Sequence, residues 1–374
     1  MASSTTSPQH GRPGEEQGAS SSHASAPVSA PDRDARLDNA KFLLIALVVL
    51  GHGIEPLTGS YEPTRALYFW IYLFHMPAFI VISGYLSRSF DGSSKRVEKL
   101  FLSLVVPYLV FWTIHQAIST AARGGLPDSL SVLKPTWTLW FLVALFLWRL
   151  SVPVWKRLRW PVAVAVVVSL FAATADLGST LSLGRVLSLL PFFVLGLCLR
   201  REHFAFLDRV WVRVCSAAVL AGTAVLAVPM SGDLSREWLF WRNSLTDRDI
   251  DPLTPSIGIR LAFMALALAM TVAVLALTPK RRTWMTALGA YTLYVYLGHA
   301  VFYKVLKATP WYDLTGGAVG TAVNIALAAA VTLLLCAPWV RWCMRWAVEP
   351  QPTWFLPEDS PLRRGKAGSG AGTG

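Results

Sequence analysis

Four of the seven histidines in this 374-residue chain lie inside long apolar runs, at His52, His75, His115 and His299. A polar side chain in hydrocarbon is costly unless it faces a cavity or finds a partner, so each is a candidate functional residue. A neutral imidazole also accepts a proton near pH 7, which suits a general base. The alternative, a histidine that merely hydrogen-bonds across packed helices, applies most readily to His115. The clustering predicts that the other three border one polar chamber within the membrane.

The spacing between Lys41 and His52 suggests what this chamber binds. Eleven residues at about 3.6 per turn make about three helical turns, so both side chains project from one face, roughly 16 Å apart. An extended acyl-coenzyme A needs a cation near its phosphates and a base near its thioester, one pantetheine arm away. We therefore predict that His52 is a catalytic base and that Lys41 binds the donor. Lys41 could equally be an ordinary anchor at a positively charged membrane face.

Glu55 lies three residues beyond His52 and close to the same helix face. Its carboxylate could orient the imidazole, as a carboxylate does in a catalytic triad, or it could lie at the outer membrane interface. The chemistry of His52 has two versions, direct general-base catalysis and an acyl-histidine intermediate. Neither requires a metal, and the four cysteines lack the paired spacing of a metal site.

The composition predicts an all-α integral membrane protein with about ten transmembrane helices that form a bundle with an internal chamber. Hydrophobic residues make up 54% of the chain and charged residues only 15%, against about 25% in soluble domains. Apolar runs of roughly 17 to 25 residues are long enough to cross a bilayer, and such runs must be helical. The expected spans are 41–57, 65–87, 100–120, 137–155, 160–176, 183–199, 210–229, 257–278, 285–305 and 318–346.

The net charge of +12 does not indicate a nucleic-acid partner, because the basic residues lie in short loops between apolar runs. Most of them fall on one side of the predicted bundle, which places both termini in the cytoplasm. Residues 1–36 are rich in Ser, Pro, Ala and Gly and are expected to form a disordered cytoplasmic tail. A transmembrane domain at 37–348 and a flexible cytoplasmic tail at 349–374 follow.

One loop on the opposite side, at about 230–256, is long and carries Trp238, Phe240, Trp241 and several acids. These aromatic residues could anchor the loop at the membrane interface. Alternatively, they could form a lip for a polar acceptor, since aromatic faces flanked by acids and amides suit sugar rings. The other loops are short, so we expect the chemistry to lie within the bundle.

Six segments, in the same order along the chain, resemble the membrane acyltransferase 3 family and in particular its fucose 4-O-acetylase-like branch. The first is LDNAKFLLIALVVLGH, which matches the family's signature of a basic residue, ten residues and an essential histidine, here Lys41 and His52. The second is YLFHMPAFIVISGYLSR, which resembles the family's Phe-His-Met-Pro segment and contains His75 and Ser83.

The third segment, SKRVEKLFLSLVVPYLVFW, resembles the family's basic pair before Pro-Tyr, and this pair corresponds to Arg96 or Lys95 together with Lys99. In the family, basic residues here are implicated in donor handling. The later segments are TLWFLVALF, which contains Trp140, LPFFVLGLCLR, and GAYTLYVYLGH, which contains His299.

The resemblance implies an O-acyltransferase that moves an acyl group, commonly acetyl, from coenzyme A to a hydroxyl of a glycan or glycosylated product. Its partners would be acyl-coenzyme A as co-substrate, the glycan acceptor and the lipid bilayer, with no bound cofactor. We expect three groups of site residues: His52, His75 and Glu55 in catalysis; Lys41, Lys95, Arg96 and Lys99 at the donor; and Ser83, Trp140, His299, Trp238 and Trp241 around the acceptor or chamber.

Two other functions fit the same residues. A transporter or flippase could use the intramembrane histidines as a proton relay, but an internal repeat would then be expected, and the Lys-x10-His element occurs once. A catalytically silent binding protein of the same fold is the other, and retention of both His52 and His75 counts against it.

Overall fold

The structure, a computed structural model, describes residues 34–125, 130–242 and 253–351, together with 355, 357 and 360–362. Within these residues every regular element is a helix or helical turn. Residues 1–33 of the expected N-terminal tail lie outside the described residues. At the start of the described chain, helix α1 (Ala35–Ile54) begins within the expected tail, and Asp34 caps it by accepting a hydrogen bond from the Arg36 amide at 3.0 Å.

Seven described helical stretches are long and apolar enough to cross a membrane, and a bent pair makes an eighth. The chain is therefore a multi-pass helical membrane protein. These stretches are α1 with the turn η1 (Glu55–Gly59), α2 (Glu62–Leu86), α3 (Ser94–Leu100) with η2 (Phe101–Val105) and α4 (Val106–Arg123), η3 (Trp137–Leu139) with α5 (Trp140–Trp155), α10 (Val210–Asp233), α11 (Leu253–Leu277) and α15 (Gly317–Leu335), with η4 (Thr180–Ser182), α7 (Leu183–Ser188) and α8 (Leu190–Cys198) as the bent pair.

The expected number of about ten spans is higher than this. The segments expected at 160–176 and 285–305 form shorter helices, α6 (Pro161–Thr174) with 14 residues and α13 (Thr292–Leu306) with 15. At about 1.5 Å per residue, neither crosses 30 Å of hydrocarbon alone. The remaining short elements are α9 (Arg201–Phe206), η5 (Arg236–Phe240), α12 (Trp284–Leu288), α14 (Trp311–Leu314) and α16 (Pro338–Val348).

The expected last span, 318–346, is two helices rather than one. Helix α15 ends at Leu335, and α16 begins at Pro338, whose ring cannot continue the preceding hydrogen-bond ladder. Three tryptophans at helical spacing, Trp339, Trp342 and Trp346, lie exposed on one face of α16. This pattern is typical of a helix that lies in the plane of the membrane interface rather than across the bilayer.

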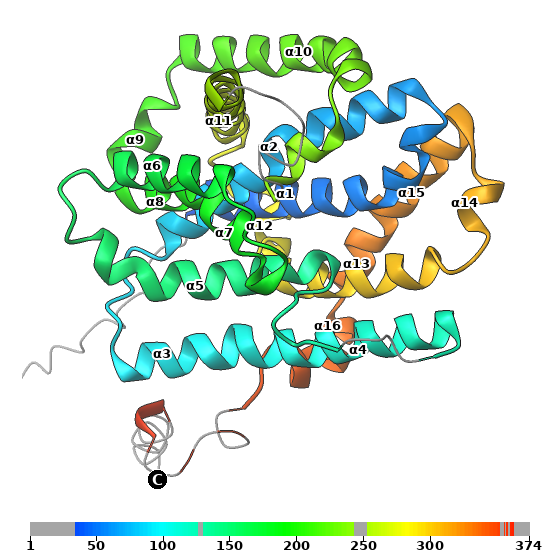
Figure 1. Cartoon of the computed structure of the whole chain (residues 1–374), viewed down its shortest axis with the longest axis horizontal. Coiled ribbons are helices and arrows are strands. Elements are labelled where there is room, and N and C mark those ends of the chain that lie inside the picture. Colours follow the sequence, from blue (N-terminus) through cyan, green and yellow to red (C-terminus); the bar gives the residue numbers. More distant parts are fainter. Residues whose placement is uncertain are drawn as a thin grey trace, which may run out of the picture. The chain divides into compact units, whose positions relative to one another are not determined.

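Helix α2 is the centre of the bundle. In its most apolar stretch 78% of the residues are buried, against 22% for α10 at the edge. Figure 1 shows α3 and α4 as one rod along one edge, α10 along the opposite edge, and α1 and α2 between them. Gly84 of α2 and Gly196 of α8 touch backbone to backbone, and a Cβ on either would collide with the other helix. Small residues permit such close approach in membranes, and here they fix the helix that carries His75.

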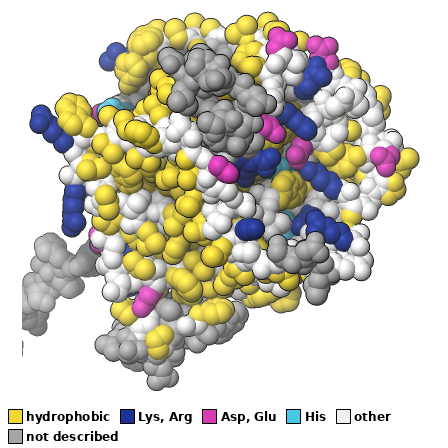
Figure 2. All heavy atoms as spheres, viewed as in Figure 1, with side chains coloured by type: hydrophobic (Ala, Val, Ile, Leu, Met, Phe, Trp, Pro, Cys, Tyr) yellow, Lys and Arg dark blue, Asp and Glu magenta, His cyan; other side chains and the backbone are white. Residues whose placement is uncertain are grey.

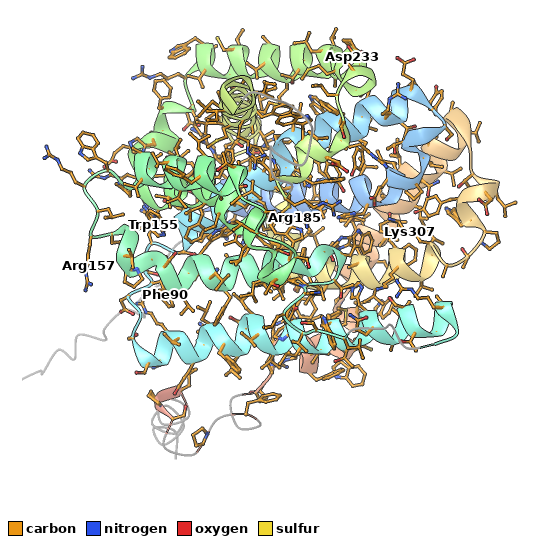
Figure 3. All side chains as sticks on the ribbon, viewed as in Figure 1. Phe90, Trp155, Arg157, Arg185, Asp233 and Lys307 are labelled. Carbon is orange, nitrogen blue, oxygen red and sulfur yellow. The ribbon has the colours of Figure 1, made fainter. Side chains whose placement is uncertain are left out.

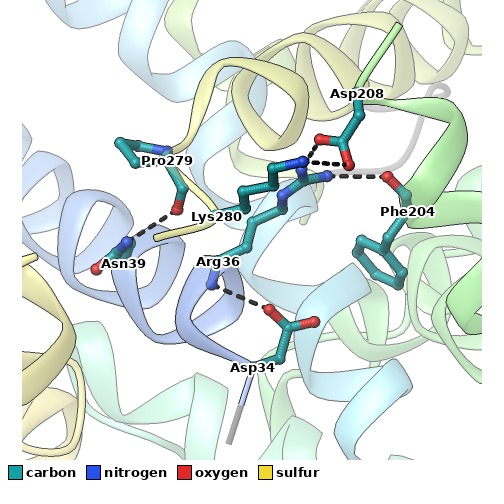
Figure 4. Close-up of polar contacts among 7 residues, drawn as sticks. All are labelled: Asp34, Arg36, Asn39, Phe204, Asp208, Pro279 and Lys280. Atoms are coloured by element: carbon teal, nitrogen blue, oxygen red, sulfur yellow. Dashed lines mark hydrogen bonds and ion pairs between the residues drawn. The ribbon is translucent and has the colours of Figure 1, made fainter. Parts of the chain in front are cut away.

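A polar clamp ties the start of α1 to two distant loops (Figure 4). The Arg36 guanidinium pairs with Asp208 and donates to the carbonyl of Phe204 at 3.0 Å, and Lys280 lies 3.3 Å from the same carboxylate. Burial opposes ionisation of Asp208, but the hydrogen bonds from Arg36 and Lys280 outweigh it and hold the pKa of Asp208 below its ordinary value. The clamp therefore fixes the end of α1 that lies opposite His52.

Asn39 forms the buried half of this attachment. Its amide nitrogen donates to the carbonyls of Pro279 and Arg281 at 2.9 and 3.0 Å, and its oxygen accepts from Thr283 and Thr286 at 2.9 and 2.7 Å. The side chain is fully buried with all four hydrogen bonds made. It holds the loop between α11 and α12 against α1.

Replacing Asn39 with alanine should destabilise the fold by roughly 1 to 3 kcal/mol, because buried partners lose their hydrogen bonds. The measurement is the melting temperature of the purified protein in detergent. Thr174→Ala, which removes an exposed hydroxyl bonded only within its own turn, is the control and should change the melting temperature little. An Asn39→Ala protein that melts with the wild type would contradict this role.

Candidate active site

A cavity of about 320 Å³ lies at the end of α1 that carries His52. We call it the chamber. Its wall is built by α1, η1, α2, η3, α5, α7, η5 and α13, so elements far apart in the sequence converge on it. The polar and aromatic residues of the wall are His52, Glu55, Tyr68, Tyr72, His75, Trp137, Thr138, Trp140, Phe141, Arg185, Arg236, Phe240, Trp241, Arg242 and Tyr296.

His52 is held by aromatic neighbours. The hydroxyl of Tyr72 lies 3.3 Å from its Nδ1, the Trp137 ring lies edge-on with centroids 4.8 Å apart, and the His299 ring stacks on it at 5.5 Å. Gly51 and Gly53 flank His52 and leave room for the rings of Tyr72 and Tyr303, which a Cβ at either position would strike. These contacts fix the plane of the imidazole and involve only its Nδ1 and its ring surface.

Glu55 connects His52 to a lysine from another helix. Its Oε2 lies 2.8 Å from Nζ of Lys307 and 3.7 Å from Nδ1 of His52. The second distance is longer than a hydrogen bond, so Tyr72 is the closer partner of Nδ1. Lys307 also lies over the ring of Trp137, at 4.6 Å from its centroid. The carboxylate thus lies in the chamber wall, between Lys307 and the half-buried His52.

His75 and His299 share one hydrogen-bonding pattern. The Nδ1 of each donates to the carbonyl four residues earlier in its helix, Ile71 at 2.8 Å and Val295 at 2.9 Å. In the neutral form Nε2 is then the proton acceptor. His75 lines the chamber, whereas His299 lies behind His52 and its buried Nε2 has no partner among the described residues. His115 is also fully buried, 6.5 Å from the Trp137 ring, and does not line the chamber.

Two further cavities continue from the chamber toward the Lys41 end of α1. The first, of about 220 Å³, we call the neck; it is mostly apolar, with Lys41, Ser83, Ser103 and Arg149 in its wall. The second, of about 370 Å³, we call the mouth; Arg96, Lys99 and Arg149 lie in its wall. The chamber and neck share Val48, Met76, Phe141 and Tyr296, and the neck and mouth share Leu86, Ser103 and Arg149. The three cavities therefore adjoin in a row.

The row has cations in the mouth, a mostly apolar neck in the middle and the imidazole of His52 in the chamber. Residues 34–341 match the acyltransferase domain that defines the acyltransferase 3 family. The chain belongs to this family. It is therefore an acyltransferase, and the resemblance of the six segments is confirmed.

Two curated relatives of this acyltransferase are rhizobial proteins, both named nodulation protein NolL. The one from Mesorhizobium japonicum is 32% identical over 193 residues, which cover 46% of this chain and 49% of that protein. The one from Sinorhizobium fredii is 27% identical over 333 residues, which cover 81% of this chain and 87% of that protein. No solved structure matches the acyltransferase.

The remaining predicted residues of the acyltransferase differ in how close they lie to the row. Lys41 lines the neck and is ion-paired with Asp38 at 2.7 Å. Ser83 lies in the neck, not in the chamber, and donates to the carbonyl of Phe79 at 2.9 Å. Lys95 is exposed and lines none of the three cavities. Of the alternatives Arg96 and Lys95, the structure thus brings only Arg96 to the mouth.

Two of the three predicted tryptophans line the chamber, and one does not. Trp140 lines the chamber beneath the Arg185 guanidinium, at 5.0 Å, and Trp241 lines it beside the charge of Arg260, at 4.3 Å. Trp238 instead stacks on Phe263 at 5.8 Å and is not in the chamber wall.

Sequence reasoning missed several residues of the candidate active site. Tyr72 and Trp137 gave no signal, because an aromatic residue in an apolar run is usually packing. Arg149 and Arg185 did give a signal. Each is an arginine within a predicted span, and an ionisable residue in a span is a candidate functional residue, as was argued for the histidines.

In Figure 3, Arg185 lies toward the middle of the bundle and Lys307 at the end of α13. Figure 2 shows a mostly hydrophobic face that is broken by a group of basic side chains, among which histidine is visible.

Proposed function

We propose that this acyltransferase moves an acyl group, with acetyl as the preferred group, from acyl-coenzyme A to a hydroxyl of a glycan or glycosylated product. The observation that carries the proposal is the row of mouth, neck and chamber. The mouth suits the nucleotide and its phosphates, the neck suits the pantetheine arm, and the chamber holds His52. Lys41 and His52, about 16 Å apart on α1, match the length of that arm.

In this reaction His52 takes the proton of the acceptor hydroxyl. The hydroxyl oxygen attacks the carbonyl carbon of the thioester, the carbon–sulfur bond breaks, and the thiolate of coenzyme A takes the proton from His52. Tyr72 and the stacked His299 hold the imidazole in place for the attack, and Glu55 balances the positive charge that His52 carries briefly. His75 faces the same chamber and is positioned to contact the reacting groups.

The test uses the full-length protein, purified in detergent, with radiolabelled acetyl-coenzyme A. The acceptors are glycans extracted from the organism that produces the protein. The expected result is label on the glycan fraction in an ester that mild base releases. Release of free coenzyme A with no labelled product, across all fractions, would contradict transfer to a hydroxyl.

We also propose that the mouth opens to the cytoplasm, with both termini and the 88–99 loop on that side. The excess of lysine and arginine in the loops of this side supports it. A reporter fused after residue 374 should be active in the cytoplasm. Activity of that reporter only outside the membrane would reverse the orientation.

The mouth gives a sharp prediction for donor binding. Lys99→Ala should raise the KM for acetyl-coenzyme A about fivefold, because a solvent-screened contact to phosphate contributes about 1 kcal/mol. Lys95 is a matched control, since it is a lysine on the same short helix that does not line the mouth. Steady-state kinetics should show Lys95→Ala at the wild-type KM. Equal effects of the two substitutions would mean that only the general charge of the loop matters.

A further inference from the structure

The chamber wall carries more positive than negative charge. Two arginines that form no ion pair among the described residues, Arg185 and Arg236, line it, and Glu55 is the one carboxylate among the described residues of the wall. Glu55 is already paired with Lys307. The excess lies at the His52 end, whereas the cations suited to coenzyme A phosphates lie in the mouth, on the far side of the neck.

Arg185 is placed inside the chamber by its contacts. Its Nε donates to the carbonyl of Phe240 at 3.1 Å, and its guanidinium lies over the ring of Trp140. Within the described parts of the chain it forms no ion pair. Its two terminal nitrogens thus remain available to a ligand that enters the chamber.

Arg236 is positioned in a similar way at the edge of the chamber. Its Nη1 donates to the hydroxyl of Thr58 at 3.1 Å, and Thr58 in turn donates to the carbonyl of Glu55 at 2.8 Å. No described carboxylate pairs with Arg236. The guanidinium is therefore tied to the turn that follows His52, next to the proposed reaction centre.

The two arginine-bearing elements are pressed together. Gly184, at the start of α7, touches the backbone of Arg242, and a Cβ there would lie 2.7 Å from the Arg242 carbonyl oxygen. The Arg242 guanidinium lies over the ring of Phe240 at 5.3 Å, and Arg185 bonds to the backbone of that residue. Arg185 and Arg242 therefore both contact Phe240.

Guanidinium groups that are partly removed from water need a counter-ion, and their planar forks match carboxylate and phosphate oxygens. The rings of Trp140 and Trp241 in the same wall offer faces for a sugar. Building on the function proposed above, we propose that the acceptor is an anionic saccharide, with a carboxylate or phosphate on or next to the sugar that is acylated. Arg185 and Arg236 bind that anion and place the hydroxyl near His52.

The test compares acceptors on the full-length protein in lipid nanodiscs with labelled acetyl-coenzyme A. One arm uses a glucuronate-containing oligosaccharide and its glucose-containing counterpart. The other uses a glycosyl polyprenyl phosphate, so that an anion on the sugar is distinguished from a lipid-borne phosphate. The wild type should acylate an anionic acceptor with a kcat/KM roughly 10- to 100-fold above the neutral one, as expected for charge-assisted hydrogen bonds.

Arg185→Gln and Arg236→Gln should remove this preference while leaving the KM for acetyl-coenzyme A unchanged. Arg157→Gln, at an exposed loop remote from Arg185 in Figure 3, is the control and should keep it. Equal wild-type rates on neutral and anionic acceptors, or an equal loss on both in Arg185→Gln, would overturn the proposal.

A binding measurement separates this proposal from the function on which it rests. The anionic ligand of either arm should raise the melting temperature of the wild type, more than the neutral oligosaccharide does, and this rise should be lost in Arg185→Gln. If the melting temperature rises in this way but no acyl group is transferred, the anion site is supported and the proposed acyl transfer is contradicted. Transfer to acceptors without a charge-dependent rise in melting temperature would contradict the anion site alone.

Discussion

Replacing His52 with alanine should lower the turnover rate roughly 100- to 10,000-fold, the usual effect of losing a general base. The affinity for acetyl-coenzyme A should change little, because the proposed function places the phosphates and the pantetheine arm in the mouth and neck. Turnover is measured with labelled donor at saturating acceptor, and donor binding by isothermal titration with the same preparation. Binding and chemistry would then separate at this residue.

His115→Ala is the matched control for the loss of an intramembrane histidine. His115 is as deeply buried as His299, but it does not line the chamber. Its replacement should lower the melting temperature and leave the turnover rate close to that of the wild type. If His52→Ala kept more than a tenth of the wild-type rate, His52 would not be the base. If it lost donor binding as fully as turnover, its role would be structural.

Tyr72→Phe tests how His52 is positioned. The substitution removes the hydroxyl 3.3 Å from Nδ1 and keeps the ring that packs beside Gly51. We expect a lower kcat with an unchanged KM for the donor, and a smaller loss than for His52→Ala. A change in the donor KM instead would indicate that Tyr72 acts through the neck.

The residues that the sequence could reveal are those whose chemistry conflicts with their surroundings. Histidines in apolar runs are costly, and the Lys41–His52 spacing depends only on regular helix geometry, so both could be read without a fold. Pro338 also predicts a helix break, but the long apolar run at 318–346 masks it, so the expected last span is longer than α15.

The rest of the site depends on which segments meet, and local patterns do not determine this. Trp137 belongs to η3, the turn before α5, and reaches His52 only because the fold brings this turn beside the end of α1. The choice between Arg96 and Lys95 depends on the rotation of α3, which places adjacent side chains about 100° apart. Arg185 reaches the chamber because Gly184 lets α7 approach the backbone of Arg242, just after η5, a contact between residues about 58 apart in the chain.

Filling the neck should stop transfer without replacing any residue of the chamber wall. Ser83 lies in the wall of the neck, whose volume is about 220 Å³. Ser83→Phe places a ring where the pantetheine arm must pass, and it should lower kcat/KM for acetyl-coenzyme A on the order of 100-fold or more, because even small displacements of a reacting group have effects of that size. Ser83→Ala removes only a hydroxyl that bonds within its own helix and should be close to wild type.

The melting temperature distinguishes a blocked neck from a damaged fold, since overpacking usually costs about 1 to 3 kcal/mol. With a folded Ser83→Phe protein, loss of transfer together with retained binding of adenosine 3′,5′-bisphosphate, the nucleotide end of the donor, would place the obstruction between mouth and chamber. The same protein with wild-type kcat/KM would mean that the donor reaches His52 by another route. In that case the basic mouth, the apolar neck and the imidazole would not form one donor path, and the observation on which the proposed function depends would be lost.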